Sequence, residues 1–243
     1  GFPGESSGVL PRPERWSGSS KTTMSYGYGM SVTPLQIATA YTALGNDGKL
    51  MPPTFVKGEH QEPRQVIDAQ IARDVVAMME TVVTQGGAKQ AAVLGYHVAG
   101  KTGTARKAGP NGYERGHYNA LFAGLVPASN PRFATVIVIN DPQAGKFYGG
   151  LVAAPVYHNV MEGALRLMDV APDDIQSWLA AQASGKVGHA ASVLPAPPPE
   201  ALAAPDAAAE FDAAVPTANA APLVPADRSP ADRAPANAPE VRQ

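Results

Sequence analysis

The stretch that decides the expected fold is Gly100-Lys101-Thr102-Gly103-Thr104-Ala105-Arg106-Lys107. A tyrosine, a histidine and a valine precede it at positions 96–98, and such residues favour an extended strand. Glycines and a proline follow at positions 109, 110, 112 and 116, so no helix can continue from it. We therefore predict a strand over residues 96–105.

The run from Lys101 to Thr104 has the chemistry of a carboxylate-binding edge. The ammonium of Lys101 supplies a positive charge, and the hydroxyls of Thr102 and Thr104 can donate hydrogen bonds to a carboxylate. Gly103 lets a substrate backbone lie close along the strand. The run predicts a site for a peptide carboxylate, and the alternative is a surface strand with an ordinary solvated lysine.

A nucleotide-binding loop is a second interpretation of the same stretch. Residues 95–102 match the pattern G-x-x-x-x-G-K-[ST], and the apolar residues 136–139 come shortly before Asp141, which could hold magnesium. Such a loop works only where it opens a helix whose N-terminal amides face the phosphates. The glycine-rich continuation favours the strand, and the P-loop is kept as the weaker alternative.

Residues 4–8 match G-x-S-x-G, the nucleophile elbow of α/β-hydrolases. That motif needs a strand before it and a helix after it. Only three residues precede it here, and Pro11 and Pro13 follow. We interpret the segment as a turn within a long loop over residues 1–20.

Two helices are predicted before the lysine strand. Thr33 caps the first, Pro34 is its first residue, and Gln36 completes a capping box. This helix should end at residues 45–48, which tolerate left-handed conformations. A second helix should run from Asp68 to residues 86–87, and helical spacing predicts its core face; that face comprises Ile71, Val75, Met78 or Met79, and Val82.

The residues after the lysine strand predict two more strands and a helix. Residues 120–126 and 133–139 are β-prone, and residues 127–132 can connect them as an antiparallel hairpin. Residues 136–139 are apolar on both faces, which is typical of a strand covered by helices on each side. A helix over residues 150–170 should cover this strand through Val156, Val160 and Leu165.

Composition divides the chain into a folded part, residues 1–180, and a tail, residues 181–243. From residue 190 onward alanine and proline dominate, so this stretch cannot bury enough apolar surface to fold, and we predict disorder. The chain has 243 residues, a net charge of -2 and no cysteine, which gives no reason to expect nucleic-acid binding and excludes disulfides. No apolar run approaches the roughly 20 residues that span a bilayer.

Four segments together resemble the class B penicillin-binding proteins, and most closely their division-specific branch in Gram-negative bacteria, the penicillin-binding protein 3 group. The segments are residues 1–5, 26–36, 100–107 and 121–124, in the family's order and with similar spacing. The resemblance covers about residues 1–170. It implies part of an α+β domain in which helices cover an antiparallel sheet, as in the penicillin-binding transpeptidases and serine β-lactamases.

The resemblance also implies an activity, a peptidoglycan D,D-transpeptidase of cell division that works through a serine acyl-enzyme. The family's S-x-x-K and S-x-N motifs are not in this sequence. We therefore expect that the chain begins partway through the domain, that the nucleophile lies upstream of Gly1, and that this fragment alone is inactive. A non-catalytic module that binds the division complex is the alternative.

By the same resemblance, the substrates are peptidoglycan stem peptides ending in D-Ala-D-Ala, and β-lactams bind at the same site. The resemblance also implies division-complex membrane proteins as partners and a place on the periplasmic face of the inner membrane. Lys101 would supply charge beside the nucleophile, Thr102 and Thr104 would bind the terminal carboxylate beside Gly103, and the Thr104 N–H would share an oxyanion site with the serine.

Five further side chains are weaker candidates for substrate binding. Arg106 lies near the carboxylate end, with a solvated arginine as the alternative. An aromatic wall would consist of Tyr28, Tyr118, Phe147 and Tyr148, and plain packing is its alternative. No cofactor is expected, and no metal, because the five histidines lack paired ligand spacing.

Overall fold

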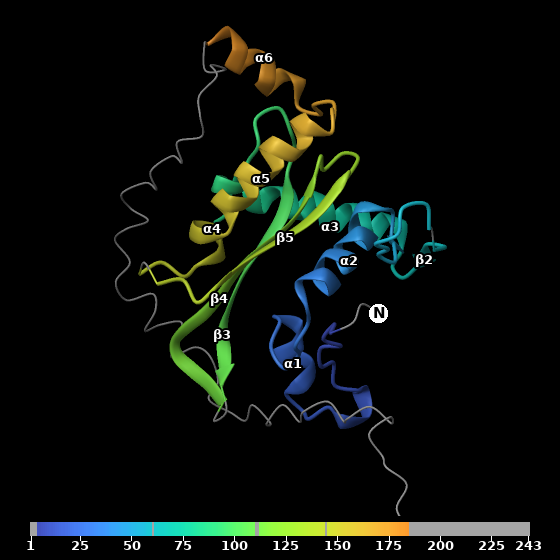
Figure 1. The fold of residues 1–243 in the computed structure, drawn as a ribbon, viewed down its shortest axis with the longest axis vertical. Helices are drawn as coiled ribbons and strands as arrows, with labels where there is room; N and C mark the ends of the chain where they lie inside the picture. Colours follow the sequence, from blue (N-terminus) through green and yellow to red (C-terminus); the bar gives the residue numbers. More distant parts are fainter. Residues whose placement is uncertain (1–3, 60, 110–111, 144, 185–243) are drawn as a thin grey trace, which may run out of the picture.

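The structure, a computed structural model, describes residues 4–59, 61–109, 112–143 and 145–184. Its centre is an antiparallel sheet of three strands in the order β3-β4-β5 (Figure 1). The strands are β3 (Ala99–Gly109), β4 (Gly112–Val126) and β5 (Phe133–Asn140). A small second sheet pairs β1 (Lys49–Leu50) with β2 (Arg64–Gln65). The antiparallel sheet predicted from the sequence is confirmed.

The predicted connection between β4 and β5 agrees with the structure, whereas the predicted bounds of β3 and the predicted start of β4 do not. The hairpin between β4 and β5 is confirmed, with residues 127–132 as its connection. The first strand begins at Ala99, three residues later than predicted, and runs on to Gly109, while β4 begins at Gly112 and not at residue 120. The extra length forms a long two-stranded ribbon in which Tyr113 and Tyr118 alternate with glycines and charged residues, and pairing between the strands extends it beyond the β-prone runs.

The helix ends follow the predicted capping signals. In α2 (Pro34–Gly45) the Gln36 N–H donates to Thr33 Oγ1 at 3.1 Å and the Thr33 N–H to Gln36 Oε1 at 2.8 Å, which confirms the capping box. Asp68 caps α3 (Ala69–Thr84) by accepting from two backbone amides. The short elements before and after these helices were not predicted; they are η1 (Pro13–Arg15), α1 (Ser20–Ser25) and η2 (Lys89–Ala91).

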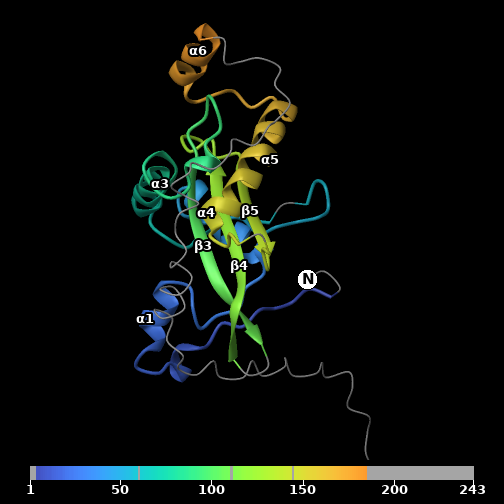
Figure 2. The ribbon, with the colours of Figure 1, turned by 90° about the vertical axis from the view of Figure 1, so that its left-hand side faces the viewer.

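Helices cover both faces of the sheet (Figure 2). On one face α4 (Gly149–Val152) and α5 (Ala154–Leu167) pack on a cluster that contains Phe122 and Tyr157, whose rings meet edge to face at 4.8 Å. On the other face α2 and α3 pack on a second cluster around Leu125. In β5, Ile137 and Ile139 are half-buried against the first cluster and Ala134 packs on the second, whereas Val138 is 38% exposed. The expected cover is therefore present on both sides but incomplete.

The predicted core faces of two helices are only partly right. In α3 the predicted Val75 and Val82 are half-buried against the core, and Met79, one of the two methionines predicted there, is buried. In α3 the buried residues are Ala72, Val76, Met79 and Val83, whereas Ile71 and Met78 are 55% and 61% exposed. In α5 Val156 and Val160 are exposed, and the helix buries Tyr157 and Met161 together with the predicted Leu165. Both helices carry apolar residues on neighbouring faces, and contact with the sheet selects the face that is buried.

The C-terminal helices differ from the single helix predicted over residues 150–170. The helix is interrupted at Ala153, between α4 and α5. Pro155, two residues later, has no N–H with which to continue the hydrogen bonding of α4. A further helix, α6 (Ile175–Ala183), crosses the boundary predicted at residue 180. Asp173 holds this segment, because its carboxylate accepts from the His97 N–H at 2.8 Å and the Ser129 hydroxyl at 2.7 Å. The tail predicted to be disordered lies, from residue 185, outside the described residues.

The turn interpretation of residues 4–8 is confirmed. The segment has neither a strand before it nor a helix after it within the described residues, and Gly4 and Gly8 have φ angles of 83° and 68°. Val9 then pairs with Ser31 as an isolated bridge. Residues 1–3, the first part of one segment that carried the family resemblance, lie outside the described residues.

Candidate active site on the edge of the sheet

The predicted site lies on β3, which is an edge strand of the sheet (Figure 1). On the side away from β4, strand β3 has no strand partner in the part of the chain that the structure describes. Its backbone groups on that side can therefore pair with an extended peptide. Lys101 lies inside this strand and opens no helix. The P-loop interpretation is therefore wrong, because the loop must lead directly into a helix whose N-terminal amides hold the phosphates, whereas Lys101 and Thr102 continue a strand.

Lys101 is exposed, and its Nζ donates a hydrogen bond to the carbonyl oxygen of Thr102 at 3.0 Å. Because side chains alternate along a strand, Lys101 points to one face of β3 and the two threonines point to the other. The strand edge thus offers a cation on one side and two hydroxyls on the other. This is an arrangement that can bind a carboxylate from two directions.

Thr102 and Thr104 lie under the beginning of α4. The Gly149 N–H donates to Thr104 Oγ1 at 3.3 Å, and Gly149 and Gly150 are both buried. A Cβ built on Gly150 would lie 3.5 Å from Thr102 Cγ2. The two hydroxyl-bearing side chains are therefore in contact with one turn of backbone, and that turn belongs to a segment far away in the sequence.

Packing against the neighbouring strand β4 is one reason why a glycine stands at position 103. A Cβ at this position would lie 2.8 Å from Leu121 Cγ on β4, which is its partner in the register. The sequence suggested that Gly103 leaves room for a substrate backbone. The structure adds a packing reason, because the Leu121 side chain already fills the space beside it.

The four predicted aromatic side chains form two groups. Tyr118 and Phe147 stack with their ring centres 4.2 Å apart, and Tyr148 lies 4.5 Å from Phe147. Tyr118 is buried on β4, and the other two precede α4. Tyr28 belongs to the second group. The structure thus brings three of the predicted aromatics together and leaves the fourth elsewhere.

Tyr28 lies on the connection between α1 and α2, in contact with Tyr26 and Tyr113 at ring-centre distances of 5.8 and 5.5 Å. Burial raises the pKa of the Tyr28 hydroxyl, and the nearby backbone of Arg106 partly opposes this rise. Arg106 is only 5% exposed, so the alternative of a solvated arginine is wrong. Tyr28 therefore lies near the backbone of β3 at Arg106, two residues beyond Thr104.

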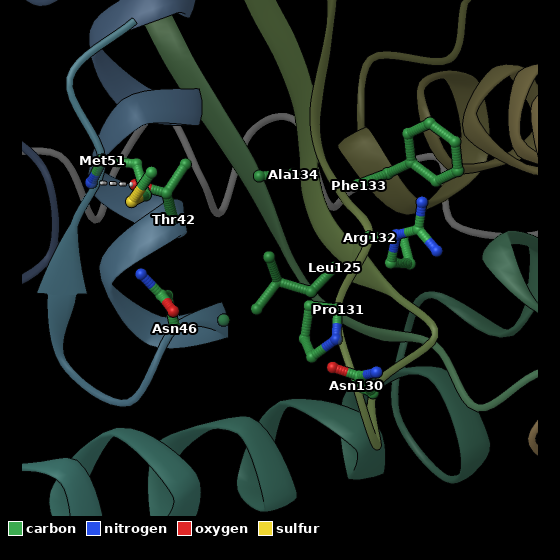
Figure 3. A pocket seen from close by; sticks show the side chains of 10 residues that line it. Thr42, Asn46, Met51, Leu125, Asn130, Pro131, Arg132, Phe133 and Ala134 are labelled. Atoms are coloured by element: carbon green, nitrogen blue, oxygen red, sulfur yellow. Dashed lines mark hydrogen bonds between the residues drawn. The ribbon is translucent and has the colours of Figure 1, made fainter. Parts of the chain in front are cut away.

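A pocket of about 300 Å³ lies away from these residues, between α2 and the β4–β5 connection (Figure 3). Its lining includes Thr42, Leu125 and Phe133, and the Met51 N–H donates to Thr42 Oγ1 at 3.0 Å beside it. None of the predicted site residues lines it. The candidate chemistry is on the β3 edge, whereas this pocket lies beside β5 at the other edge of the sheet.

Sequence reasoning missed three residues of this site. Gly149 contacts Thr104, and Tyr26 and Tyr113 contact Tyr28. The pair Gly149-Gly150 before an apolar helix was a usable signal, because paired glycines often mark a close approach of two backbones. Tyr26 opens the segment 26–36 that carried the family resemblance, whereas no comparable signal distinguishes Tyr113 from an ordinary surface tyrosine.

Comparison with known proteins decides the family. Residues 1–162 match the profile of the penicillin-binding protein transpeptidase domain. The chain belongs to this family. It is 49% identical over 175 residues to the peptidoglycan D,D-transpeptidase FtsI of Escherichia coli, an alignment that covers 71% of the chain and 30% of that protein. It is 44% identical over 178 residues to the probable peptidoglycan D,D-transpeptidase PbpC of Pseudomonas aeruginosa, covering 72% and 32%.

A solved structure of a penicillin-binding protein agrees with this family. The transpeptidase domain of Burkholderia pseudomallei penicillin-binding protein 3 matches with a TM-score of 0.65 and 40% identity, over 71% of this chain and 54% of that one. A structure described as a peptidoglycan glycosyltransferase from Burkholderia ambifaria matches with a TM-score of 0.62 and 37% identity, over 71% and 52%. This member of the penicillin-binding family thus spans about half of those chains and 30% of FtsI.

Proposed function

We propose that this chain supplies the lysine strand of a peptidoglycan D,D-transpeptidase of cell division. The observation that carries the proposal is the open edge of β3, with exposed Lys101 on one face and Thr102 and Thr104 on the other. FtsI and PbpC, which are 49% and 44% identical to it, bear the name of this activity. The nucleophile comes from an S-x-x-K motif that the printed sequence does not contain.

The reaction divides into two acyl transfers. A serine oxygen attacks the carbonyl of the penultimate D-Ala, the C–N bond breaks, and D-Ala leaves with the serine's proton on its amine. An amine of a second stem peptide then attacks the resulting ester. A new C–N bond forms, the C–O bond to the serine breaks, and the amine's proton returns to the serine oxygen. A β-lactam enters the same first step, but its ring opens and no leaving group departs, so the ester persists.

In this scheme the residues of this chain stabilise negative charge that develops in the reaction and hold the substrate in position. The Lys101 ammonium lowers the energy of negative charge beside the nucleophile, and the Thr102 and Thr104 hydroxyls hold the terminal carboxylate. The Thr104 N–H donates to the oxyanion together with the serine's own N–H, and loss of one such donor typically costs about 10² to 10³ in rate. Tyr118, Phe147 and Tyr148 form an aromatic wall beside the stem peptide, while Tyr28 and Arg106 close the far end of the strand.

The proposed setting is the periplasmic face of the inner membrane, where stem peptides and β-lactams are accessible and where membrane proteins of the division complex are partners. The support is the kinship with FtsI. No helix among the described residues is long and apolar enough to cross a bilayer.

A chimera tests the proposed activity. In FtsI the segment that aligns with this chain is replaced by the aligned residues of this chain, and the rate of covalent labelling by fluorescent penicillin is measured. We expect labelling within about tenfold of that of FtsI, because order and identity over the aligned segment preserve the strand and its neighbours. A chimera that melts cooperatively but takes no label overturns the proposed activity and favours the non-catalytic binding module.

A further inference from the structure

We propose that Gly149 is a positioning residue of the carboxylate site: its backbone N–H fixes the hydroxyl of Thr104 so that the hydroxyl proton faces the substrate. The proposal rests on the proposed function, and it adds a residue from outside the lysine strand. Gly149 and Thr104 are 45 positions apart, and the 3.3 Å hydrogen bond between them joins α4 to β3.

The direction of this hydrogen bond decides what the hydroxyl can do. A threonine hydroxyl has one proton to donate and two lone pairs that accept. Because the Gly149 N–H donates to Oγ1, it occupies one lone pair and leaves the proton available. A carboxylate has no proton of its own and needs a donor. The Gly149 contact therefore biases Thr104 toward the role that a carboxylate requires.

The close approach explains why this position is a glycine. A Cβ on Gly149 would lie 2.2 Å from the Leu121 carbonyl oxygen and 2.7 Å from that of Gly103. Both are backbone atoms of paired strands and cannot move aside singly. The φ angle of Gly149 is not left-handed, so conformation gives no reason for glycine here. Any side chain would push α4 away from β3 and lengthen the bond to Thr104.

The turn that carries Gly149 is fixed from both sides. Before it, Phe147 stacks on Tyr118 of β4, and Tyr148 packs against Phe147. After it, a Cβ on Gly150 would lie 2.1 Å from the Gly87 carbonyl oxygen, so Gly150 also approaches backbone closely. The direction of the Gly149 N–H is thus set before a substrate arrives, and preorganised donors of this kind are the ones that favour a charged ligand.

The test compares a charged and a neutral acylating agent on the chimera described above. The second-order acylation rate constant is measured for benzylpenicillin, which carries the carboxylate, and for its methyl ester, which does not. We expect Gly149→Ala to lower the rate with benzylpenicillin about tenfold, because a hydrogen bond to a charged group is lost, and to change the ester rate much less. The quantity compared is the ratio of the benzylpenicillin rate constant to the ester rate constant. Thr104→Val should lower this ratio as Gly149→Ala does, and the double variant should lower it no further.

Gly163→Ala is the matched control, because a Cβ on Gly163 in α5 would meet nothing within 4 Å and the ratio should not change. Equal losses with both agents, or an additive loss in the double variant, would overturn the role of Gly149. If Gly149→Ala does not fold, Thr104→Ser replaces it: the Gly149 N–H should hold the serine hydroxyl and keep the ratio, and a ratio equal to that of Thr104→Val contradicts the proposal. A folded chimera that is never acylated overturns the proposed function itself, and this inference with it.

Discussion

Lys101 contributes charge and little packing, because its side chain is exposed and its Nζ donates a hydrogen bond to the backbone oxygen of its neighbour Thr102. In the chimera we expect Lys101→Ala to lower the acylation rate at least about 100-fold, as removal of a charge aimed at the reacting centre should. The free energy of unfolding should change by no more than about 0.5 kcal/mol, because the substitution is at an exposed position. The melting temperature should therefore change little. Labelling by fluorescent penicillin and thermal melting measure the two effects.

Lys107→Ala is the control for charge alone. Lys107 lies on the same strand, six residues further on, which corresponds to roughly 20 Å at about 3.3 Å per residue. Its removal should leave the acylation rate within about threefold of the parent, because screening weakens a charge at that distance. A normal rate in Lys101→Ala, or equal losses in both variants, would remove Lys101 from the proposed site.

Tyr157 makes the stability of the chain sensitive to alkaline pH. Its hydroxyl is buried with no hydrogen-bond partner in the described structure, and burial raises its pKa far above the ordinary value of 10.0. Above pH 10 the unfolded chain loses this proton while the folded chain keeps it, so the free energy of unfolding falls as pH rises. Tyr157→Phe should remove that part of the fall, and melting curves from pH 8 to about pH 11 measure it.

At neutral pH the same substitution should be neutral or stabilising by about 1 kcal/mol, because it removes an unpaired buried hydroxyl and keeps the ring against Phe122. Tyr41, whose pKa burial also raises, remains in both proteins and cancels in the comparison. Parallel declines of the two proteins above pH 10 would show that the Tyr157 hydroxyl ionises freely in the folded state.

At the scale of elements, two adjacent methionines of α3, between which the sequence did not decide, differ in burial. Met79 is 7% exposed and packs on the cluster around Leu125, whereas Met78 is 61% exposed. Met79→Ala should lower the free energy of unfolding by about 2 to 5 kcal/mol through lost burial and a cavity. Met78→Ala should lower it by about 0.5 kcal/mol or less. Urea unfolding of both variants measures this, and equal costs would contradict the placement of α3.

Local signals predicted the ends of helices better than their buried faces. The cap residues Thr33 and Asp68 bond within their own first turns, so four residues of sequence suffice to find them. Which face of α3 or α5 is buried depends on the sheet that packs against it, and this contact spans long stretches of chain. One helix end was missed although a local signal for it was present. Pro155 lies at the start of α5, and a proline near a helix start marks a boundary, yet a single helix was predicted across it.

At the scale of the whole molecule, the sequence located strand β3, which carries the candidate site, but not the distant segments that pack around it. Lys101, Thr102 and Thr104 are adjacent in sequence, and their strand follows from local composition. The contact of Gly149 with Thr104, the burial of Arg106 and the attachment of α6 through Asp173 each join distant segments. Pairings of this kind carry no periodic pattern, and only the folded chain shows them.

The printed chain by itself should form no covalent adduct with a β-lactam. Acylation needs a serine with a lysine base three positions later, held beside the K-T-G strand, and no serine of this sequence has a lysine at that spacing. Intact-mass spectrometry after incubation with excess benzylpenicillin should therefore show the unmodified chain, under conditions in which the chimera gains the full mass of the drug. A stoichiometric adduct on one serine, absent from Lys101→Ala, would show that this chain carries its own nucleophile and would contradict the division of the site between two segments.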